Sequence, residues 1–425
     1  MTMYNAIVDA AENTAMKVEG IDGIIPAGTA IQNLRGTKLG DTLTADGYHL
    51  SDTYGDYTAS LMWYVALTGE SLDKVTYVPD SVAEHIYNVK RAVARAYYQP
   101  YAVSDLTETV LLAGSDFQTR PPQTGLNQID AILGGIEKTD GYTHFDGLLM
   151  GGDYTADHGH DNSVIGLQAL KPHMAGVVNH NLIYSEGNHD APTVEGLTPT
   201  GNNDPLNGAY GLFVINEEDY GQFGGGGDVI AVQLKDYLDE KVGNKSWGNK
   251  PVFVLCHVPL HYSYRTLLDQ QGRTAMPIVN ALNDAGSKGL NVIFLFGHNH
   301  SDEYDAYLGG SSVYLKKGDT MLVPSTANHK EYQSVKLNFT YLNVGYVGGY
   351  PASQLGSDST LTMTTFRIQA DGAVIITRYD KDGYHNLKSK GVVNTNLADK
   401  CPANETVYSP SRIVTATSDE EYTGD

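Results

Sequence analysis

Val292-Ile293-Phe294-Leu295-Phe296-Gly297-His298-Asn299-His300 joins an apolar run directly to a polar motif. Five consecutive β-branched, aliphatic and aromatic residues predict a strand that is buried on both faces. The Gly-His-Asn-His motif then lies at the carboxyl end of that strand, where open α/β sheets bind their ligands. His298 and His300 leave the strand edge in different directions, so we expect each imidazole to meet a different metal ion. Taken alone, the motif also fits two solvated loop histidines.

The same arrangement recurs at four earlier strands. Apolar strands are predicted over residues 109–115, 145–152, 181–186 and 251–256, and helices over residues 163–178 and 278–285. The strands lead, in order, to Asp116-Phe117-Gln118, Asp153, Gly187-Asn188-His189-Asp190 and His257. Alternating strands and helices indicate a largely parallel sheet that brings these side chains to one edge. Oxygen and imidazole donors without sulfur suit Mn, Fe or Zn.

The composition limits the partners of the chain. Its 425 residues exceed the usual size of one domain. Lys and Arg number 28 against 50 Asp and Glu, and the formal net charge of −22 makes nucleic acid an unexpected partner. No membrane segment and no secretory signal are found, and two cysteines exclude a disulfide framework or a thiolate zinc cluster. Composition leaves the compartment and the oligomeric state open.

The first hundred residues carry a different motif. Helices are predicted over residues 3–17 and 80–97, the second with a capping box at Ser81 and Glu84, and a short strand over residues 23–26. Asp46 precedes His49 by three residues, a spacing at which a carboxylate can orient an imidazole as a general base. Residues 28–33 and 46–51 resemble the C-terminal part of SGNH (GDSL-type) hydrolases. The serine nucleophile of that family lies far upstream, so the resemblance implies a partial α/β segment in which Asp46 and His49 are remnants.

The ordered motifs between residues 109 and 385 resemble those of the calcineurin-like metallophosphoesterases. That family has Asp-x-His, Gly-Asp, Gly-Asn-His-Asp/Glu, His and Gly-His-x-His in this order, and here Gln118 replaces the first His. The resemblance implies a four-layer α/β/β/α sandwich. It also implies hydrolysis of a phosphomonoester or phosphodiester, in a small phosphorylated substrate, by a hydroxide that two metal ions activate.

Carried over by position, the resemblance implies two metal sites that share one carboxylate. The first ion would be held by Asp116, Gln118, Asp153 and His300, and the second by Asp153, Asn188, His257 and His298. A carboxamide oxygen is a weaker and harder donor than an imidazole, so the first site is expected to be looser or to favour Mn over Zn.

Four further side chains receive roles in the chemistry. His189 is the expected proton donor to the leaving oxygen, and Asp157 is expected to support it from a shifted position. His158 and His261 are candidate substrate contacts, with a solvated loop position as the alternative for each.

We therefore predict three regions: a truncated hydrolase-like segment over residues 1–103, a phosphoesterase domain over residues 104–386 and an acidic linker or tail over residues 387–425. Residues 191–230 are expected to form a flexible rim. A secretory signal could have been lost if the front of the first segment is missing. Two other functions stay open: noncatalytic binding of a phosphate ligand at a degenerate metal site, suggested by Gln118, and a carboxylesterase remnant that uses Asp46 and His49.

Overall fold

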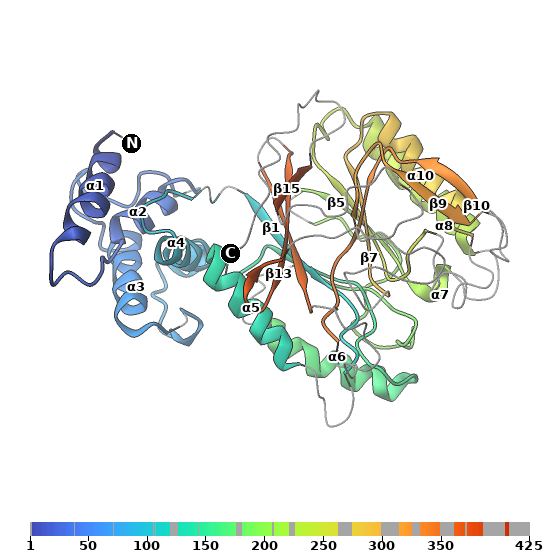
Figure 1. Cartoon of the computed structure of the whole chain (residues 1–425), viewed down its shortest axis with the longest axis horizontal. Helices are drawn as coiled ribbons and strands as arrows, with labels where there is room; N and C mark the ends of the chain where they lie inside the picture. The colour runs from blue at the N-terminus through green and yellow to red at the C-terminus, as the bar shows by residue number, and fades with distance from the viewer. Residues whose placement is uncertain are drawn as a thin grey trace. The chain divides into compact units, whose positions relative to one another are not determined.

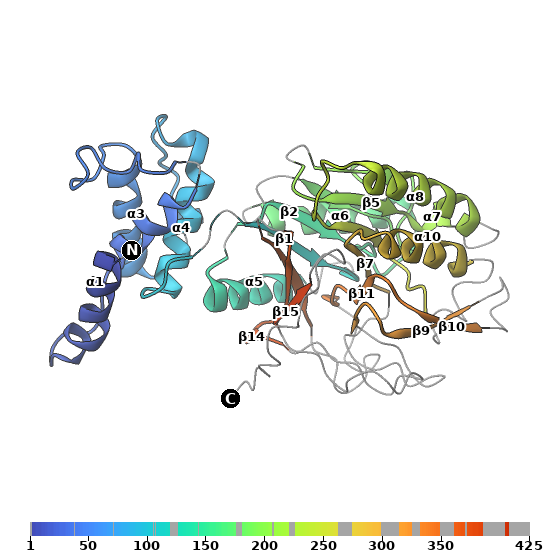
Figure 2. The same ribbon diagram turned by 90° about the horizontal axis from the view of Figure 1, so that it is seen from above.

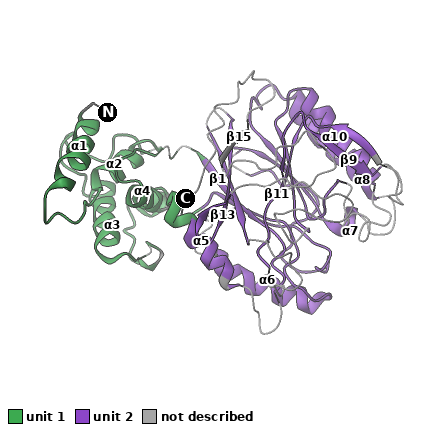
Figure 3. Cartoon of the chain, viewed as in Figure 1, with its two compact units in different colours: residues 1–108, 136–144 green, residues 109–135, 145–425 purple. Residues whose placement is uncertain are grey.

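The computed structural model of this chain divides into two compact units. Figure 1 colours the chain along its sequence, and Figure 3 gives each unit its own colour. Unit 1 comprises residues 1–108 and 136–144, and unit 2 comprises residues 109–135 and 145–425. The structure describes residues 2–37, 39–70, 72–104, 106, 108–119, 126–142, 144–175, 181–205, 208–220, 226–261, 274–298, 314–324, 332–348, 361–369, 372–385 and 404–407.

Unit 1 is helical in its described residues. It contains α1 (Thr2–Asn13), α2 (Ala27–Arg35), α3 (Tyr54–Thr68) and α4 (Ile86–Tyr98), with 3-10 turns η1 (Ala15–Lys17), η2 (Leu72–Lys74) and η3 (Ala83–His85). Its core contains Leu34 of α2, Met62 of α3 and Val93 of α4, all fully or nearly fully buried.

Two predictions for unit 1 are wrong. No strand forms over residues 23–26, and the only β pairing among the described residues of this unit is an isolated bridge between Thr44 and Leu50, so these residues do not make a partial α/β segment. The capping box is also not formed: α4 begins only at Ile86, after the 3-10 turn η3, and its first turn has no side-chain cap.

The first sheet of unit 2 has the strand order β14-β13-β12-β1-β2-β3, and β15 also pairs with β13. Strands β1, β2 and β3 are parallel to one another, whereas β12 and β13 run antiparallel to their neighbours. The strand bounds are β1 (Thr109–Gly114), β2 (Gly147–Met150), β3 (Leu182–Tyr184), β12 (Met363–Ile368), β13 (Val374–Asp380), β14 (Gly383–Tyr384) and β15 (Asn404–Val407).

The second sheet has the order β4-β5-β6-β7-β11-β8, in which β5, β6, β7 and β11 are parallel. Its strands are β4 (Gly201–Asn202), β5 (Gly211–Ile215), β6 (Val252–Cys256), β7 (Val292–Phe296), β8 (Tyr314–Leu315) and β11 (Thr340–Asn343). A separate antiparallel pair joins β9 (Thr320–Pro324) to β10 (Tyr332–Lys336).

Strand β7 is buried on both faces, as its sequence predicts. Successive side chains point to opposite faces of the strand, and each face packs in a different core. Val292, Phe294 and Phe296 belong to the core shared with α8 (Gly226–Gly243) and α10 (Ala275–Ser287), which lie side by side in Figures 1 and 2. Ile293 and Leu295 belong to a second core that also contains side chains of the first sheet. The two sheets of unit 2 therefore pack face to face.

The remaining helices of unit 2 are α6 (His160–Ala175), α7 (Glu217–Tyr220) and most of α5 (Asn127–Asp140), whose last residues belong to unit 1. The chain is thus mixed α/β, as predicted. Among the described residues, no helix is both long and apolar enough to cross a membrane.

Two segments that were predicted to be irregular contain regular secondary structure. Residues 191–230 do not form only a rim, since they contain β4, β5, α7 and the start of α8, and every residue of β5 is buried. In the predicted tail, residues 404–407 form β15, while residues 386–403 and 408–425 lie outside the described part.

Candidate metal centre

Strands from both sheets end around one group of buried polar side chains. Asp116 follows β1 and Asp153 follows β2 in the first sheet, whereas His257 follows β6 and His298 follows β7 in the second. All four are at most 1% exposed. Asn188 follows β3 and is partly buried. The sequence predicted this convergence at one sheet edge, and in the structure two packed sheets provide it together.

Four of the predicted site residues have a left-handed backbone. Their φ angles are 56° at Asp116, 51° at Gln118, 58° at Asp153 and 69° at His298, and Asn181 is the one other described non-glycine residue with positive φ. Residues with a side chain rarely adopt this conformation, and it persists where surrounding contacts impose it, often at functional sites. The strand ends are therefore held by the contacts around the site rather than by local preference.

The motif glycines allow the loops to approach closely. A Cβ atom on Gly187 would lie 2.3 Å from Oδ1 of Asp153, and one on Gly297 would lie 1.9 Å from Oγ of Ser115 and 2.6 Å from Oδ2 of Asp116. Any side chain at these positions would push a ligand-bearing loop out of place.

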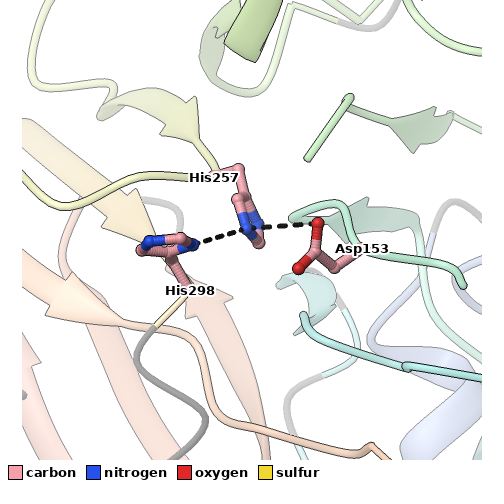
Figure 4. A group of neighbouring side chains, drawn as sticks. All are labelled: Asp153, His257 and His298. Carbon is pink, nitrogen blue, oxygen red and sulfur yellow. Dashed lines mark hydrogen bonds and ion pairs between the residues drawn. The ribbon is translucent and has the colours of Figure 1, made fainter. Parts of the chain in front are cut away.

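His257 lies at the centre of the group. Its Nδ1 donates to the carbonyl of Gly151 at 2.6 Å, which directs the lone pair of Nε2 into the site. Nε2 lies 3.0 Å from Oδ1 of Asn188 and 3.4 Å from Oδ1 of Asp153. It also lies 3.2 Å from Nδ1 of His298 (Figure 4).

The charges of the group favour a cation at Nε2 of His257. Burial alone would lower the pKa of His257, but the carboxylates of Asp153 and Asp116 outweigh burial and raise that pKa to about 10. Burial also opposes ionisation of Asp153, but its pairing with His257 keeps the pKa of Asp153 below the usual range. The group therefore attracts positive charge, which a proton or a metal ion can supply.

The donor set fits a divalent cation. In the described part of the chain, Asp153, His257 and His298 form one buried group whose possible ligand atoms all lie within 4.8 Å of one another. Asn188 adds an amide oxygen that already contacts His257. One carboxylate, two imidazoles and one amide oxygen suit Mn, Fe or Zn.

Asp190 was not predicted as a site residue, but its side chain holds two loops of the site together. Its Oδ2 accepts hydrogen bonds from the backbone N–H groups of Asp153 at 2.7 Å and Gly187 at 2.9 Å, and its Oδ1 accepts from Tyr154 at 3.0 Å. Burial and the nearby Asp153 raise the pKa of Asp190 to about 7. Asp190 thus ties together the loops after β2 and β3, and its place as the fourth residue of Gly-Asn-His-Asp was the available signal.

His189 lies at the rim of the group. Its Nδ1 donates to the carbonyl of Ala156 at 2.9 Å, and its Nε2 lies 3.9 Å from Oδ2 of Asp153. Ala156 therefore provides the support that was predicted from Asp157, which is exposed. His158 is exposed and stacks on the ring of His189, with 4.3 Å between ring centroids.

The other three predicted site residues are Gln118, His261 and His300. Gln118 is buried, and its Nε2 donates to Oδ2 of Asp153 at 2.7 Å, so its nitrogen, not its oxygen, faces that carboxylate. His261 is not at the surface: it is 5% exposed and contacts the hydroxyl of Tyr341 at 2.7 Å. Burial lowers the pKa of His261 to about 3. His300 lies outside the described residues.

A family model matches the N-terminal region of the chain. Residues 1–97 match the family described as a domain of unknown function (DUF4886). A crystal structure of a DUF4886 family protein from Bacteroides uniformis ATCC 8492 matches with 42% identity over 25% of this chain and 41% of that protein, at a TM-score of 0.24. The chain thus spans less than half of that protein, and so low a TM-score does not define a shared fold. No curated protein matches. The family match does not include the candidate metal centre.

Proposed function

We propose that this protein is a metal-dependent phosphoesterase that hydrolyses a small phosphomonoester or phosphodiester. The observation that carries the proposal is the convergence of Asp153, His257 and His298 at strand ends of two packed sheets. A fully loaded centre would hold two ions (Mn, Fe or Zn). The motif order assigns Asp116, Gln118 and His300 to the ion that does not use His257 and His298, and His300 lies outside the described residues. When bound, such ions supply Lewis acidity, which lowers the pKa of a coordinated water and neutralises phosphoryl oxygens.

The fold supports this proposal at a coarse level. Two sheets pack face to face, and α8 and α10 cover the outer face of one of them. We propose that this arrangement is the four-layer α/β/β/α sandwich that the motif order implies.

The proposed roles of the chain's own residues follow from their contacts. His257 would present Nε2 to a metal ion because its Nδ1–H is committed to the carbonyl of Gly151, and an ion there would take the place of the Nε2 proton. His189 is the proposed proton donor to the leaving oxygen: its Nδ1 is held by the carbonyl of Ala156, and its Nε2, 3.9 Å from Oδ2 of Asp153, would carry the transferable proton. The net charge of −22 disfavours polyanionic substrates, so a small phosphorylated molecule fits better than nucleic acid.

The proposal is tested with p-nitrophenyl phosphate and bis-p-nitrophenyl phosphate in the presence of Mn²⁺. We expect turnover that EDTA removes and Mn²⁺ restores. Asp153→Ala and His257→Ala should abolish turnover while circular dichroism shows an unchanged fold. His173→Ala is the matched control, because His173 contacts Asp130 and not the metal centre. Full turnover by Asp153→Ala would refute the metal assignment.

A second candidate activity, hydrolysis of a carboxylic ester, rests on Asp46 and His49 in unit 1. His49 Nδ1 lies 2.7 Å from Oδ2 of Asp46, so the predicted carboxylate–imidazole contact is formed. Hydrogen bonds from the backbone and side chain of His49 lower the pKa of Asp46 to about 2. Both side chains are largely exposed, with 83% and 54% of their surface accessible for His49 and Asp46.

Hydrolysis of p-nitrophenyl acetate separates this esterase from the phosphoesterase. Acetate turnover that survives EDTA and is lost in His49→Ala would favour the esterase. Metal binding without turnover of either ester would instead favour a noncatalytic binder of phosphate ligands.

A further inference from the structure

The two carboxylate oxygens of Asp153 have different partners. Oδ1 accepts the backbone N–H of His189 at 2.9 Å and lies 3.4 Å from Nε2 of His257. Oδ2 accepts the side-chain amide of Gln118 at 2.7 Å. Each oxygen thus accepts one hydrogen bond, but Oδ1 also faces the ligand group around His257, whereas Oδ2 faces the side-chain amide of Gln118.

Gln118 is held firmly in this position. Its backbone N–H donates to the carbonyl of Asp153 at 2.9 Å, in addition to the side-chain contact, and the residue is 1% exposed. The amide nitrogen must face the carboxylate, because an amide oxygen 2.7 Å from an ionised carboxylate would place two acceptors together. On this side of Asp153, the chain presents an N–H group where a ligand would present a lone pair.

The second carboxylate on that side is also partly committed. Oδ2 of Asp116 accepts the backbone N–H of His298 at 2.8 Å and so fixes the loop after β7. Its Oδ1 lies 4.0 Å from Nε2 of His257. Asp116 therefore helps to place His298 as well as offering an oxygen to a cation.

We infer that Gln118 is a positioning residue that makes the two cation sites on either side of Asp153 unequal. The inference rests on the proposed function and names how its centre is loaded. A divalent cation on the Oδ1 side meets His257, His298 and Asn188 in their present arrangement. A cation on the Oδ2 side must first break the hydrogen bond between Gln118 and Asp153. The two ions bind in sequence, and the second is the exchangeable one, so activity depends on the free metal concentration.

Calorimetric titration of the metal-free full chain with Mn²⁺ tests this inference. The wild-type protein should bind one ion tightly and a second at least about tenfold more weakly. Gln118→Met keeps the length of the side chain but removes the donor, so Asp153 loses its orientation and the first step should weaken by about 10- to 100-fold. Gln118→His offers a nitrogen lone pair on the Oδ2 side, so the dissociation constants of the two Mn²⁺ ions should become more similar.

The substitutions add little backbone strain, because Met and His are unbranched at Cβ like Gln and tolerate the same φ of 51°. Gln128→Met, at a partly buried Gln of α5, is the matched control and should leave both steps unchanged. Electron paramagnetic resonance of the wild-type protein with one equivalent of Mn²⁺ gives a readout that needs no variant. We expect the six-line signal of an isolated ion.

Several results would overturn the inference. Two equal binding steps in the wild-type protein, or a spin-coupled pair at one equivalent, would show that Asp153 serves both sides alike. Loss of only the second step in Gln118→Met would make Gln118 a ligand of the second ion. Phosphoester turnover together with two equal Mn²⁺ binding steps would refute the inference alone. Unequal Mn²⁺ binding steps without phosphoester turnover would refute the proposed function alone. A wild-type protein that binds no Mn²⁺ would refute both.

Discussion

His189 has a proposed role that leaving-group chemistry can separate from metal binding. In His189→Ala, kcat for an alkyl phosphate should fall by about 10²- to 10⁴-fold, because an alkoxide must be protonated as it departs. p-Nitrophenolate is a stable leaving group, so kcat for p-nitrophenyl phosphate should fall much less. Steady-state kinetics on both substrates measures the difference.

His158→Ala is the control for this prediction. It removes the stacked neighbour of His189 but not the proposed proton donor, so it should not change the ratio of the two kcat values. An equal loss on both substrates in His189→Ala would mean that His189 positions the centre and does not transfer a proton.

His261 should make folding stability depend on pH. Burial lowers its pKa to about 3, so between that value and the ordinary pKa the unfolded chain binds a proton that the folded protein does not. The free energy of unfolding should therefore fall as the pH drops below about 6.5, by about 1.4 kcal/mol per pH unit.

His261→Gln removes the titration, and groups shared by both proteins cancel in the comparison. Urea denaturation at pH 7.5 and pH 5.0 should show a loss larger by about 2 kcal/mol in the wild-type protein. Equal losses in both proteins would show that His261 titrates normally in the folded state.

Residue identities from the sequence indicated the candidate metal centre but not every contact within it. Asp153, His257 and His298 come together because each follows an apolar strand, and this pattern is visible in the sequence. The role of Gln118 could not be predicted, because an amide can present either its oxygen or its nitrogen and only its neighbour Asp153 decides which. The burial of His261 depends on the path of its loop toward Tyr341, which spacing does not specify.

At the scale of elements, the loop glycines allow the strand ends to approach closely. A Cβ on Gly187 would lie 2.3 Å from Oδ1 and 2.4 Å from the backbone nitrogen of Asp153. Gly187→Ala should therefore displace Asp153, weaken Mn²⁺ affinity by more than about tenfold and lower the free energy of unfolding by roughly 1–3 kcal/mol. Calorimetric titration and urea denaturation measure the two effects.

Gly134→Ala provides the comparison. A Cβ at Gly134, inside α5, would meet no atom within 4 Å, so this variant should keep its metal affinity and gain up to about 1 kcal/mol of stability. Unchanged affinity in Gly187→Ala would mean that the loop after β3 adjusts without moving Asp153.

The elements that the sequence missed have a physical explanation in common. Strand β5 lies between segments rich in Gly, Asn and Asp, so its apolar run was assigned to the rim. It is nonetheless a strand because Leu212 and Val214 face the first sheet while Phe213 faces the helices. Strands β6 and β7 have the same length as β5, but their runs are apolar throughout, as burial on both faces favours, whereas β5 begins with Gly211.

At the scale of the whole molecule, the candidate ligands lie in unit 2, so metal should stabilise one unit selectively. A ligand that binds only the folded state adds about 2.7 kcal/mol at a concentration of 100 times its dissociation constant. For a unit of this size, the unfolding midpoint should rise by roughly 5 °C. Differential scanning calorimetry with Mn²⁺ or EDTA should therefore show one transition that moves and one, from unit 1, that does not.

Hydrogen exchange assigns the transitions to the units. Mn²⁺ should slow exchange in peptides covering residues 145–190 and leave residues 54–98 of unit 1 unchanged. Asp153→Asn removes the charge that pairs with His257, so neither the midpoint nor the exchange of this variant should respond to Mn²⁺. A wild-type midpoint that is the same in Mn²⁺ and EDTA, or an equal response in both units, would mean that the buried group in unit 2 is not where the metal binds.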